Sequence, residues 1–412
     1  MERLIFHVDV NSAYLSWEAA KRISQGGEDI RLIPSAIGGD KEKRTGVILA
    51  KSIPAKKFNI KTGEPVAMAL RKCPDLYLAR PDFHLYEESS RAFMDICRKY
   101  TPVVEKYSID ECFLDMSRMK RVICDPITVA LSIKDEIWDS LGFTVNIGIS
   151  TGKILAKMAS DFEKPNKIHT LYPDEIESKL WPLPVRFLFT VGRTTEERLH
   201  KIHIRTIGDL ARSDIKAIQR AVGEKAGKQI HDFANGIDDS TILSEPEDAK
   251  GYSCSTTLDR DITRSMEAHK VLLALADGAA SRMRADGVKA YCISVNIRSH
   301  DFKNKSHQIK MTDATDITTE IFHACKKLFD EMWDNRTPIR LLGVSLTDLT
   351  KEDDLQQTFF PDKEKERLKD LDKVVDSIRN KFGTEKVLWG SMLQSADVGK
   401  RYKAQLDKRR KK

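Results

Sequence analysis

Three acidic residues stand out because they interrupt apolar, strand-like runs. Asp9 lies within "LIFHVDVNSAY" (residues 4–14), and Asp110 and Glu111 are adjacent in "YSIDECFLD" (residues 107–115). A carboxylate among buried apolar residues is costly unless hydrogen bonds or a cation compensate it. If these acids meet at one place, they repel one another and become protonated unless cations neutralise them. The pattern therefore predicts a metal site made by Asp9, Asp110 and Glu111.

The predicted ligands are all oxygens, which favour Mg²⁺, with Mn²⁺ as a substitute, over Zn²⁺. Two such ions ~4 Å apart can activate a hydroxyl group and stabilise a leaving phosphate in one in-line displacement. Adjacent residues on a flat strand face opposite ways, so Asp110 and Glu111 can serve one site only beside a turn or bulge. The alternative, three solvated loop acids, suits Asp110 and Glu111 better than Asp9.

The elements expected around these acids alternate between strands and helices up to about residue 170, which indicates an α/β or α+β sheet domain. Asp9 is placed on a short buried strand, residues 4–10, and the helix that follows is expected to end at Gly26 and Gly27. Further strands are predicted at 30–37, 45–52, 103–117 (two short ones) and 143–150, and further helices at 85–102, 126–142 and 152–165.

Short helices with glycine turns are expected from Trp181 to Asp239. Within "TVGRTTEERLHKIHIRTIGDLA", Val191 and Gly192 precede a basic amphipathic helix. Backbone N–H groups at such a turn can hold a phosphate, although an ordinary helical hairpin has the same pattern.

The last part of the chain changes character again. Residues 240–250 are polar and without periodicity, which predicts a linker. Residues 251–350 follow a β-α-β-β-α-β order, the split βαβ pattern of a sheet with two helices on one face. A short aromatic stretch, "LQQTFF" (355–360), then precedes a charged helix.

Composition sets the broad class. A chain of 412 residues predicts two to four domains, and 69 Lys and Arg against 62 Asp and Glu give a net charge of +7. The excess is modest, but it is concentrated in locally basic stretches that suit phosphate contacts. The seven cysteines are scattered without a C-x-x-C pair, which argues against a zinc site or disulfides. With no apolar run of membrane-spanning length and no signal peptide at the start, the sequence predicts a cytoplasmic protein.

Four stretches in this order resemble the motifs of the Y-family, the translesion DNA polymerases, and within it the bacterial DNA polymerase IV and UmuC-like branch. They are "FHVDVNSAY", "YSIDECFLDMS", "VNIGISTGKILAKMASDFEKPN" and "TVGRTTEERLHKIHIRTIGDL". The resemblance implies an α+β multidomain right hand with palm, fingers, a helical thumb containing helix-hairpin-helix turns, and a split βαβ little finger. The implied bounds are 1–15 and 82–171 for the palm, 16–81 for the fingers, 172–239 for the thumb, 240–250 for the linker, 251–350 for the DNA-binding little finger and 351–412 for the tail.

The same resemblance implies a template-directed, low-fidelity DNA polymerase that adds dNTPs to a primer 3′ end in damage tolerance and DNA repair. Asp9 and Asp110 would bridge two Mg²⁺ ions, and the carbonyl group of Val10 would complete the metal shell. Glu111 would be the third carboxylate, beside the primer 3′-hydroxyl.

Nucleotide-binding residues are implied in the same way. The backbone N–H groups of Ala13 and Tyr14 would cradle the triphosphate, and Lys164 would bind it. The ring of Tyr14 would be the steric gate that excludes a ribose hydroxyl, although a core aromatic residue is the simpler interpretation of Tyr14 alone. The chain departs from the family pattern in "SIPAKKFNI", where Ile53 and Lys56 replace the usual Tyr and Arg. Lys56 can neutralise phosphate without the planar fork of Arg, so we expect weaker or differently organised triphosphate binding.

The implied partners are primer–template DNA, a dNTP and a sliding clamp, for a protein that is a monomer and binds no membrane. The expected DNA contacts are Val191, Gly192, Arg193, Thr194 and Arg298. "LQQTFF" resembles a clamp-binding peptide with Gln356, Phe359 and Phe360 as its anchors, because two aromatic rings can fill an apolar pocket.

Two other classes of function remain open from the residues. A nucleotidyl cyclase also uses paired aspartates on a palm-like sheet, but it needs no glycine-turn thumb or clamp peptide. A DNA- and clamp-binding accessory protein without activity is favoured only by the departures at Ile53 and Lys56.

Overall fold

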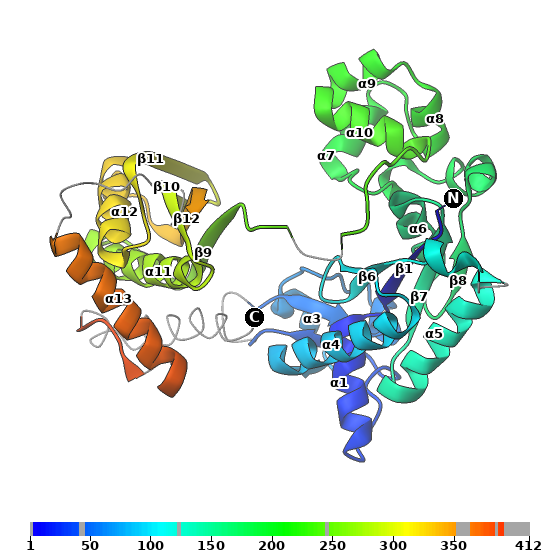
Figure 1. The fold of residues 1–412 in the computed structure, drawn as a ribbon, viewed down its shortest axis with the longest axis horizontal. Helices are drawn as coiled ribbons and strands as arrows, with labels where there is room; N and C mark the ends of the chain where they lie inside the picture. Colours follow the sequence, from blue (N-terminus) through cyan, green and yellow to red (C-terminus); the bar gives the residue numbers. More distant parts are fainter. Residues whose placement is uncertain are drawn as a thin grey trace. The chain divides into compact units, whose positions relative to one another are not determined.

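The computed structural model describes residues 3–40, 46–121, 125–243, 247–351, 363–383 and 386–390. The chain divides into two compact units, residues 1–246 and 247–412, and each unit contains its own sheets and cores (Figure 1). None of the helices in these described ranges combines the length and the apolar character that a membrane span requires.

The largest sheet of the first unit has the strand order β5-β6-β1-β7-β8. The central strand, β1, is antiparallel to both of its neighbours, β6 and β7. Helices α4 and α5 cover one face of this sheet, and α6 covers the other. The bounds of these elements are β1 Ile5–Val10, α4 Phe83–Tyr100, β5 Val104–Lys106, β6 Glu111–Asp115, α5 Pro126–Leu141, β7 Val145–Ser150, α6 Lys153–Ser160 and β8 Ile168–Thr170.

Strand β1 is buried on both faces, and its alternation separates two environments. Phe6, Val8 and Val10 pack in the large apolar core under α4 and α5. Successive side chains of a strand point to opposite faces, so His7 and Asp9 lie on the α6 side instead. The polar residues of this apolar run therefore share one face with each other, and that face is turned toward α6.

Helix α6 can lie directly on this face because β7 carries Gly148 at the crossing. A Cβ atom on Gly148 would meet the carbonyl oxygen of Ala156 at 1.9 Å, far inside a van der Waals contact. The close approach brings the side chains of α6 within reach of β1 and β6.

A second, smaller sheet in the first unit has the order β3-β2-β4 and its own apolar core. Its strands are β2 Ser35–Gly38, β3 Ile48–Lys51 and β4 Tyr77–Ala79, and its helices are α2 Ile53–Lys56 and α3 Val66–Lys72. Strand β4 and helix α3 were not predicted, and the strand expected over 30–37 is reduced to β2. Helix α1 (Ala13–Ser24) buries Leu15 and Trp17 in the core of the larger sheet, although residues from 16 onward were assigned to the fingers.

The helical part of the first unit contains four short α-helices around a separate core, which α6 also enters with Leu155 and Met158. The helices are α7 Arg193–His200, α8 Ile207–Arg212, α9 Ile215–Val222 and α10 Glu224–Ala234. The first residues of the predicted linker are held on the large sheet rather than free. Ile242 packs with Ile5, and the Leu243 N–H donates to Glu105 Oε2 at 2.8 Å.

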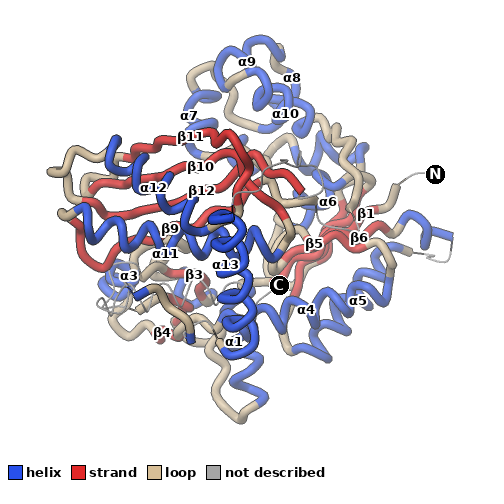
Figure 2. The backbone as a smooth tube through the Cα atoms, turned by 60° about the vertical axis from the view of Figure 1, so that its left-hand side comes forward, coloured by secondary structure: helices blue, strands red, loops and turns tan. Residues whose placement is uncertain are grey.

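The second unit has the predicted β-α-β-β-α-β order, in a sheet with the strand order β11-β10-β12-β9. Figure 2 shows the four strands side by side in this order. The helices share one core with the sheet, to which β10 contributes Ile293, Val295 and Ile297, while the intervening Asn296 is exposed. The bounds are β9 Gly251–Ile262, α11 Ser265–Ala285, β10 Val288–Ser299, β11 Asn304–Thr315, α12 Thr318–Met332 and β12 Ile339–Lys351. A further helix, α13 (Lys363–Phe382), lies in the predicted tail and contacts α11.

Candidate active site

The pairing of β1 with β6 brings the three predicted acids to one end of the large sheet. Asp9 is directly opposite Glu111 in the register, and the N–H of Val10 donates to the carbonyl oxygen of Asp110 at 3.0 Å. Asp110 itself lies in the turn before β6, where the N–H of Ser108 donates to the Glu111 carbonyl oxygen at 3.1 Å. Asp110 and Glu111 therefore lie beside a turn, as two adjacent acids must if both are to serve one site.

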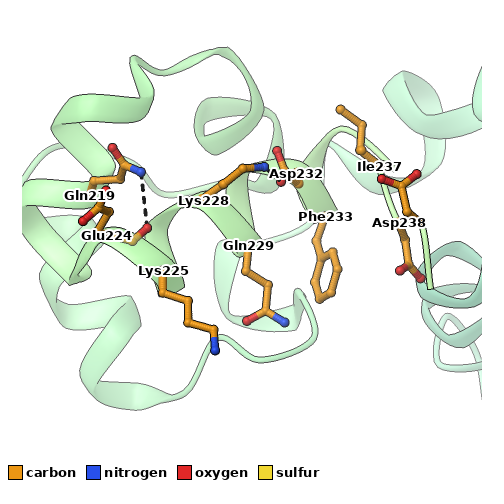
Figure 3. A pocket seen from close by; sticks show the side chains of 10 residues that line it. Gln219, Glu224, Lys225, Lys228, Gln229, Asp232, Phe233, Ile237 and Asp238 are labelled. Atoms are coloured by element: carbon orange, nitrogen blue, oxygen red, sulfur yellow. Dashed lines mark hydrogen bonds and ion pairs between the residues drawn. The ribbon is translucent and has the colours of Figure 1, made fainter.

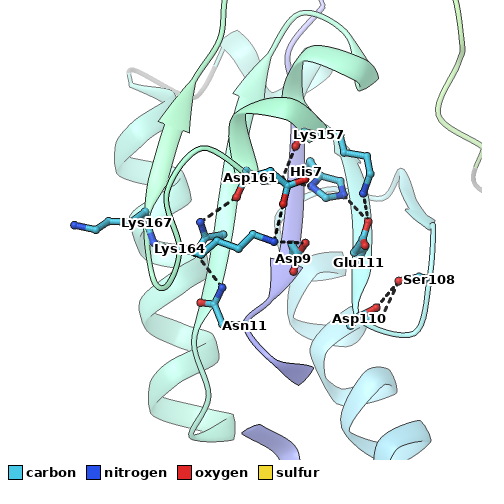
Figure 4. A network of polar contacts seen from close by, with 12 residues as sticks. His7, Asp9, Asn11, Ser108, Asp110, Glu111, Lys157, Asp161, Lys164 and Lys167 are labelled. Carbon is cyan, nitrogen blue, oxygen red and sulfur yellow. Dashed lines mark hydrogen bonds and ion pairs between the residues drawn. The ribbon is translucent and has the colours of Figure 1, made fainter. Parts of the chain in front are cut away.

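The side chain of Asp9 is paired with a lysine from a distant loop. Lys164 Nζ lies 2.8 Å from Asp9 Oδ2 and 2.8 Å from Asp161 Oδ1, so one ammonium group bridges two carboxylates (Figure 4). Lys164 was predicted to bind a triphosphate, and in this structure it pairs with the most buried acid of the set.

Glu111 has different partners. Lys157 of α6 donates to Glu111 Oε2, and His7 Nε2 lies 3.1 Å from the same oxygen. The other ring nitrogen of His7 lies 2.8 Å from Ser160 Oγ, which fixes the imidazole between β1 and α6. Asp110, on the far side, accepts a hydrogen bond of 2.6 Å from Ser108 (Figure 4).

These contacts give the two opposed acids opposite electrostatic environments. Burial raises the pKa of Asp9 to about 6, and the favourable charge of Lys164 offsets only part of that effect. Burial also acts to raise the pKa of Glu111, but hydrogen bonds from His7 and Lys157 outweigh it and lower that pKa to about 2. Burial lowers the pKa of His7, which favours the neutral imidazole. At neutral pH Glu111 is a stabilised carboxylate and Asp9 is a destabilised one.

The residues fit a hard divalent cation in chemical type. Asp9, Asp110 and the Val10 carbonyl group would supply oxygen ligands, and an added cation would relieve the cost of burying the Asp9 carboxylate. Among the residues described, however, no three His, Cys, Asp or Glu side chains are already arranged around a common point as metal ligands. The acids are paired with Lys164, Lys157 and Ser108 instead.

The predicted nucleotide-binding residues lie where α1 begins, directly after β1. Ser12 has a left-handed backbone (φ 48°), and Ala13 and Tyr14 are the first helical residues. The first N–H groups of a helix have no intrahelical acceptor, so these two can donate to an anion. The half-buried ring of Tyr14 stacks on Tyr86, with ring centroids 4.5 Å apart, and this contact fixes its orientation.

The remaining predicted residues have other surroundings. Lys56 is exposed at the end of α2, as is Ile53 at its start, and within the described ranges Lys56 forms no ion pair with the three acids. Gly192 is the exposed N-cap of α7, next to the buried Val191 and to the exposed Arg193 and Thr194. Arg298 lies on β10 in the second unit and donates to Asn304 at 2.8 Å. Gln356, Phe359 and Phe360 lie outside the described residues.

Five residues of the site were missed by the sequence analysis: His7, Asn11, Asn146, Lys157 and Asp161. Asn11 donates to Asn146 at 3.0 Å and accepts from the N–H of Asn166 at 2.9 Å, which holds the loop that carries Lys164. The sequence could have revealed His7. Side chains alternate between the two faces of a strand, so His7, two residues before Asp9, is expected on the same face as Asp9.

The thumb-like helices form a cavity of about 590 Å³ that contains none of the predicted acids. Side chains of both charges line it, including Lys225, Lys228 and Asp232 of α10 (Figure 3). The N–H groups at the start of α10 follow Gly223, whose φ of 103° favours glycine. Gly192 is likewise the N-cap residue of α7, but its backbone is extended (φ −85°), so the two glycine turns differ in conformation.

Three family models and several known proteins match this chain, and the proteins match over almost its whole length. The family model of the impB/mucB/samB family matches residues 8–161, the model of its C-terminal domain matches residues 249–359, and a DNA polymerase-iota thumb domain model matches residues 188–238. DNA polymerase IV of Clostridium acetobutylicum is 44% identical over 398 residues, which cover 96% of this chain and 100% of that protein. DNA polymerase IV 2 of Bacillus subtilis is 34% identical, with 96% of both chains covered.

A solved structure supports the same architecture. A Y-family DNA polymerase chimera, Dbh-Dpo4(243-245)-Dbh, is similar with a TM-score of 0.72 over 85% of this chain and 100% of that one. At 21% identity this likeness bears on the fold alone, and with the thumb-domain match it confirms the predicted α+β multidomain polymerase fold.

Fold and relatives together define a DNA-directed DNA polymerase, which favours the predicted enzyme over the cyclase and the inactive accessory protein. The chain belongs to the impB/mucB/samB family, the Y-family of DNA polymerases, in its DNA polymerase IV branch. The polymerases of this family act on primer–template DNA and dNTPs and depend on metal ions.

Proposed function

We propose that this polymerase extends a primer 3′ end with low fidelity and past damaged template bases, with two Mg²⁺ ions at Asp9, Val10, Asp110 and Glu111. The observation that carries the proposal is the β1–β6 pairing, which sets Asp9 opposite Glu111 with Asp110 in the adjoining turn. When bound, the two ions lower the pKa of the attacking hydroxyl group and neutralise charge at the reacting phosphate.

The chain's own groups then have separate tasks. The N–H groups of Ala13 and Tyr14 orient the triphosphate at the start of α1, and Lys164 exchanges its carboxylate partners for phosphate oxygens. Glu111 lies beside the primer hydroxyl group, where Lys157 and His7 keep it ionised. The ring of Tyr14, held against Tyr86, closes the space that a ribose 2′-hydroxyl would need.

DNA is proposed to lie against the glycine turn from Val191 to Thr194 and against the basic strands of the second unit, including Arg298. Contacts of this kind reach the phosphate backbone and are independent of sequence, so binding should weaken steeply as salt is added. Low fidelity follows if the site holds the nascent base pair mainly through the DNA backbone and the triphosphate. The proposed protein acts as a monomer.

Primer extension in Mg²⁺ tests the proposal, first on an undamaged template and then across a panel of defined lesions. Asp110→Ala should abolish extension. Asp115→Asn changes an acid at the other end of the same strand, which is not part of the predicted metal site, and should retain most activity. Extension by Asp110→Ala at wild-type rate would refute the assignment of the site. Normal extension that stops at every lesion would refute only the translesion role.

A further inference from the structure

Lys157 of α6 is held beside Glu111 by two aromatic rings as well as by the ion pair. Its side chain is 10% exposed, and its Nζ lies over the rings of Tyr107 and Phe189, 5.1 Å and 5.3 Å from the ring centroids. A cation within about 6 Å of a ring centroid is attracted to the face of the ring, more strongly where water is excluded. The two rings also contact each other edge to face, with centroids 6.4 Å apart. Tyr107 and Phe189 therefore form an aromatic clamp around the Lys157 ammonium group.

The clamp joins two parts of the first unit. Tyr107 belongs to the turn that carries the acids, since its N–H donates to the Glu111 carbonyl oxygen at 3.1 Å, and its ring contacts Phe113 of β6 with centroids 5.4 Å apart. Phe189 precedes α7 and packs against the apolar core of the helical part. The position of the Lys157 ammonium group thus depends on the large sheet and on the helical part together.

The two carboxylate oxygens of Glu111 are used unequally. Lys157 Nζ and His7 Nε2 both reach Oε2, whereas Oε1 accepts no hydrogen bond from any residue that the structure describes (Figure 4). Oε1 is therefore the oxygen that remains for the reaction. Because lysine carries its charge on a flexible four-carbon stem, Lys157 can orient Glu111 only if its own ammonium group is fixed. The aromatic clamp supplies that restraint.

We propose that Tyr107 and Phe189 are positioning residues for Glu111, which act by fixing Lys157 on Oε2. This inference rests on the proposed function, because that function gives Glu111 its task beside the primer hydroxyl group. With the clamp intact, Glu111 presents Oε1 in one orientation. Without it, the ammonium group moves between Oε2 and water, and Glu111 is oriented by His7 alone. Because Phe189 is anchored in the helical core, the orientation of Glu111 also depends on the packing of that core.

Single-turnover insertion of a dNTP on primer–template DNA in Mg²⁺ tests the proposal. Phe189→Leu keeps an apolar side chain against the helical core but removes the ring face, so it should lower the maximal insertion rate about three- to tenfold. The dissociation constants of the dNTP and of the DNA should change by less than about twofold, because Glu111 is assigned to the reacting hydroxyl group and not to either ligand's binding. Phe189→Tyr keeps the ring face and should retain the wild-type rate.

Phe187→Leu is the matched control. It makes the same substitution two positions earlier, at a side chain that is 65% exposed and that contacts no other ring or cation among the described residues. This variant should insert the dNTP at the wild-type maximal rate.

A double-mutant cycle shows whether the Phe189 ring acts through the lysine. Lys157→Met should itself lower the maximal rate, and Phe189→Leu should cause no further loss in that background. A loss that came only from disturbed packing of the helical core would persist there. A further loss of the same size in the Lys157→Met background, or a wild-type rate for Phe189→Leu alone, would overturn the proposal.

Failure of the clamp and failure of the proposed function give different results. If the proposed function is wrong, the wild type does not extend the primer, or Asp110→Ala extends it at the wild-type rate. If only the clamp is wrong, the wild type extends, Asp110→Ala does not, and Phe189→Leu inserts the dNTP as fast as Phe187→Leu.

Discussion

Replacing the central acid Asp9 by Asn should stabilise the metal-free protein while abolishing polymerase activity. Asp9 has 12% of its side chain exposed, and its pKa is raised from 3.8 to about 6, mainly by burial. The carboxylate is therefore held in the fold at a cost. Asn keeps the shape and an oxygen that can accept from Lys164, but it removes the charge that burial disfavours.

The size of the effect follows from the pKa rise. A shift from 3.8 to about 6 corresponds to about 3 kcal/mol of unfolding free energy. The sign follows because the native state holds the proton of Asp9 to a higher pH than the unfolded chain does. Wild-type stability therefore falls as the pH rises from about 4 to about 6 and is constant above that range, as far as Asp9 is concerned. The stability of Asp9→Asn should not fall over this pH range, because Asn does not ionise.

Scanning calorimetry of the full chain in EDTA, from pH 4 to pH 8, measures the difference. The transition of the first unit should be higher in Asp9→Asn by roughly 6–12 °C at pH 7.5, and the difference should vanish near pH 4. Adding 10 mM Mg²⁺ should raise the transition of the wild type more than that of the variant, because the ion requires the carboxylate.

Asp161→Asn is the matched control, because Asp161 contacts the same Lys164 at the same 2.8 Å but is half exposed. It should change stability by no more than about 0.5 kcal/mol. Equal stability of Asp9→Asn and wild type at pH 7.5 in EDTA would show that burial of the Asp9 carboxylate carries no cost. A stability difference between Asp9→Asn and wild type that stayed the same from pH 4 to pH 8 would also refute the cost of burying the carboxylate.

Four further outcomes are expected. Glu111→Gln should destabilise the protein, the opposite of Asp9→Asn, because the pKa of Glu111 is lowered from 4.5 to about 2. The Glu111 carboxylate therefore contributes about 3 kcal/mol of unfolding free energy above pH 4.5, and this contribution is lost as the pH falls toward 2. Urea titrations at several pH values measure the difference. Tyr14→Ala should raise ribonucleotide insertion relative to deoxynucleotide insertion in single-nucleotide assays, whereas Tyr14→Phe should not. Lys56→Ala should raise the KM for dNTP about three- to tenfold with kcat little changed, and an unchanged KM would remove Lys56 from the nucleotide site. Alanine at Phe359 and Phe360 should weaken sliding-clamp affinity at least about thirtyfold in a direct binding assay without affecting extension by the polymerase alone.

Local sequence pattern predicted most of the elements that carry the site. The sequence pattern predicted β1, α4, α5 and β7 close to their observed bounds. The two strands are continuous apolar runs, and the two helices are long, periodic segments that end at proline or glycine. The three-residue strands β4 and β8 and the helix α3 escaped prediction. Short segments of this kind depend on the strands they pair with more than on their own residues.

The helix predicted over residues 152–165 is shorter in the structure. It ends at Ser160, and the residues beyond it form the loop that presents Asp161 and Lys164 to the sheet. That loop is fixed by Asn11 and Asn146, which lie far away in the sequence.

The sequence by itself determined that acids interrupt two apolar strands and that a helix begins directly after the first of them. These features are local, since each depends on a few neighbouring residues and on the strand and helix periods. Only the tertiary structure decided which cation each acid meets. Lys164 reaches Asp9 across 155 positions and Lys157 reaches Glu111 across 46. Burial and those partners set the direction of each pKa shift, and both depend on how α6 and its following loop pack on the sheet.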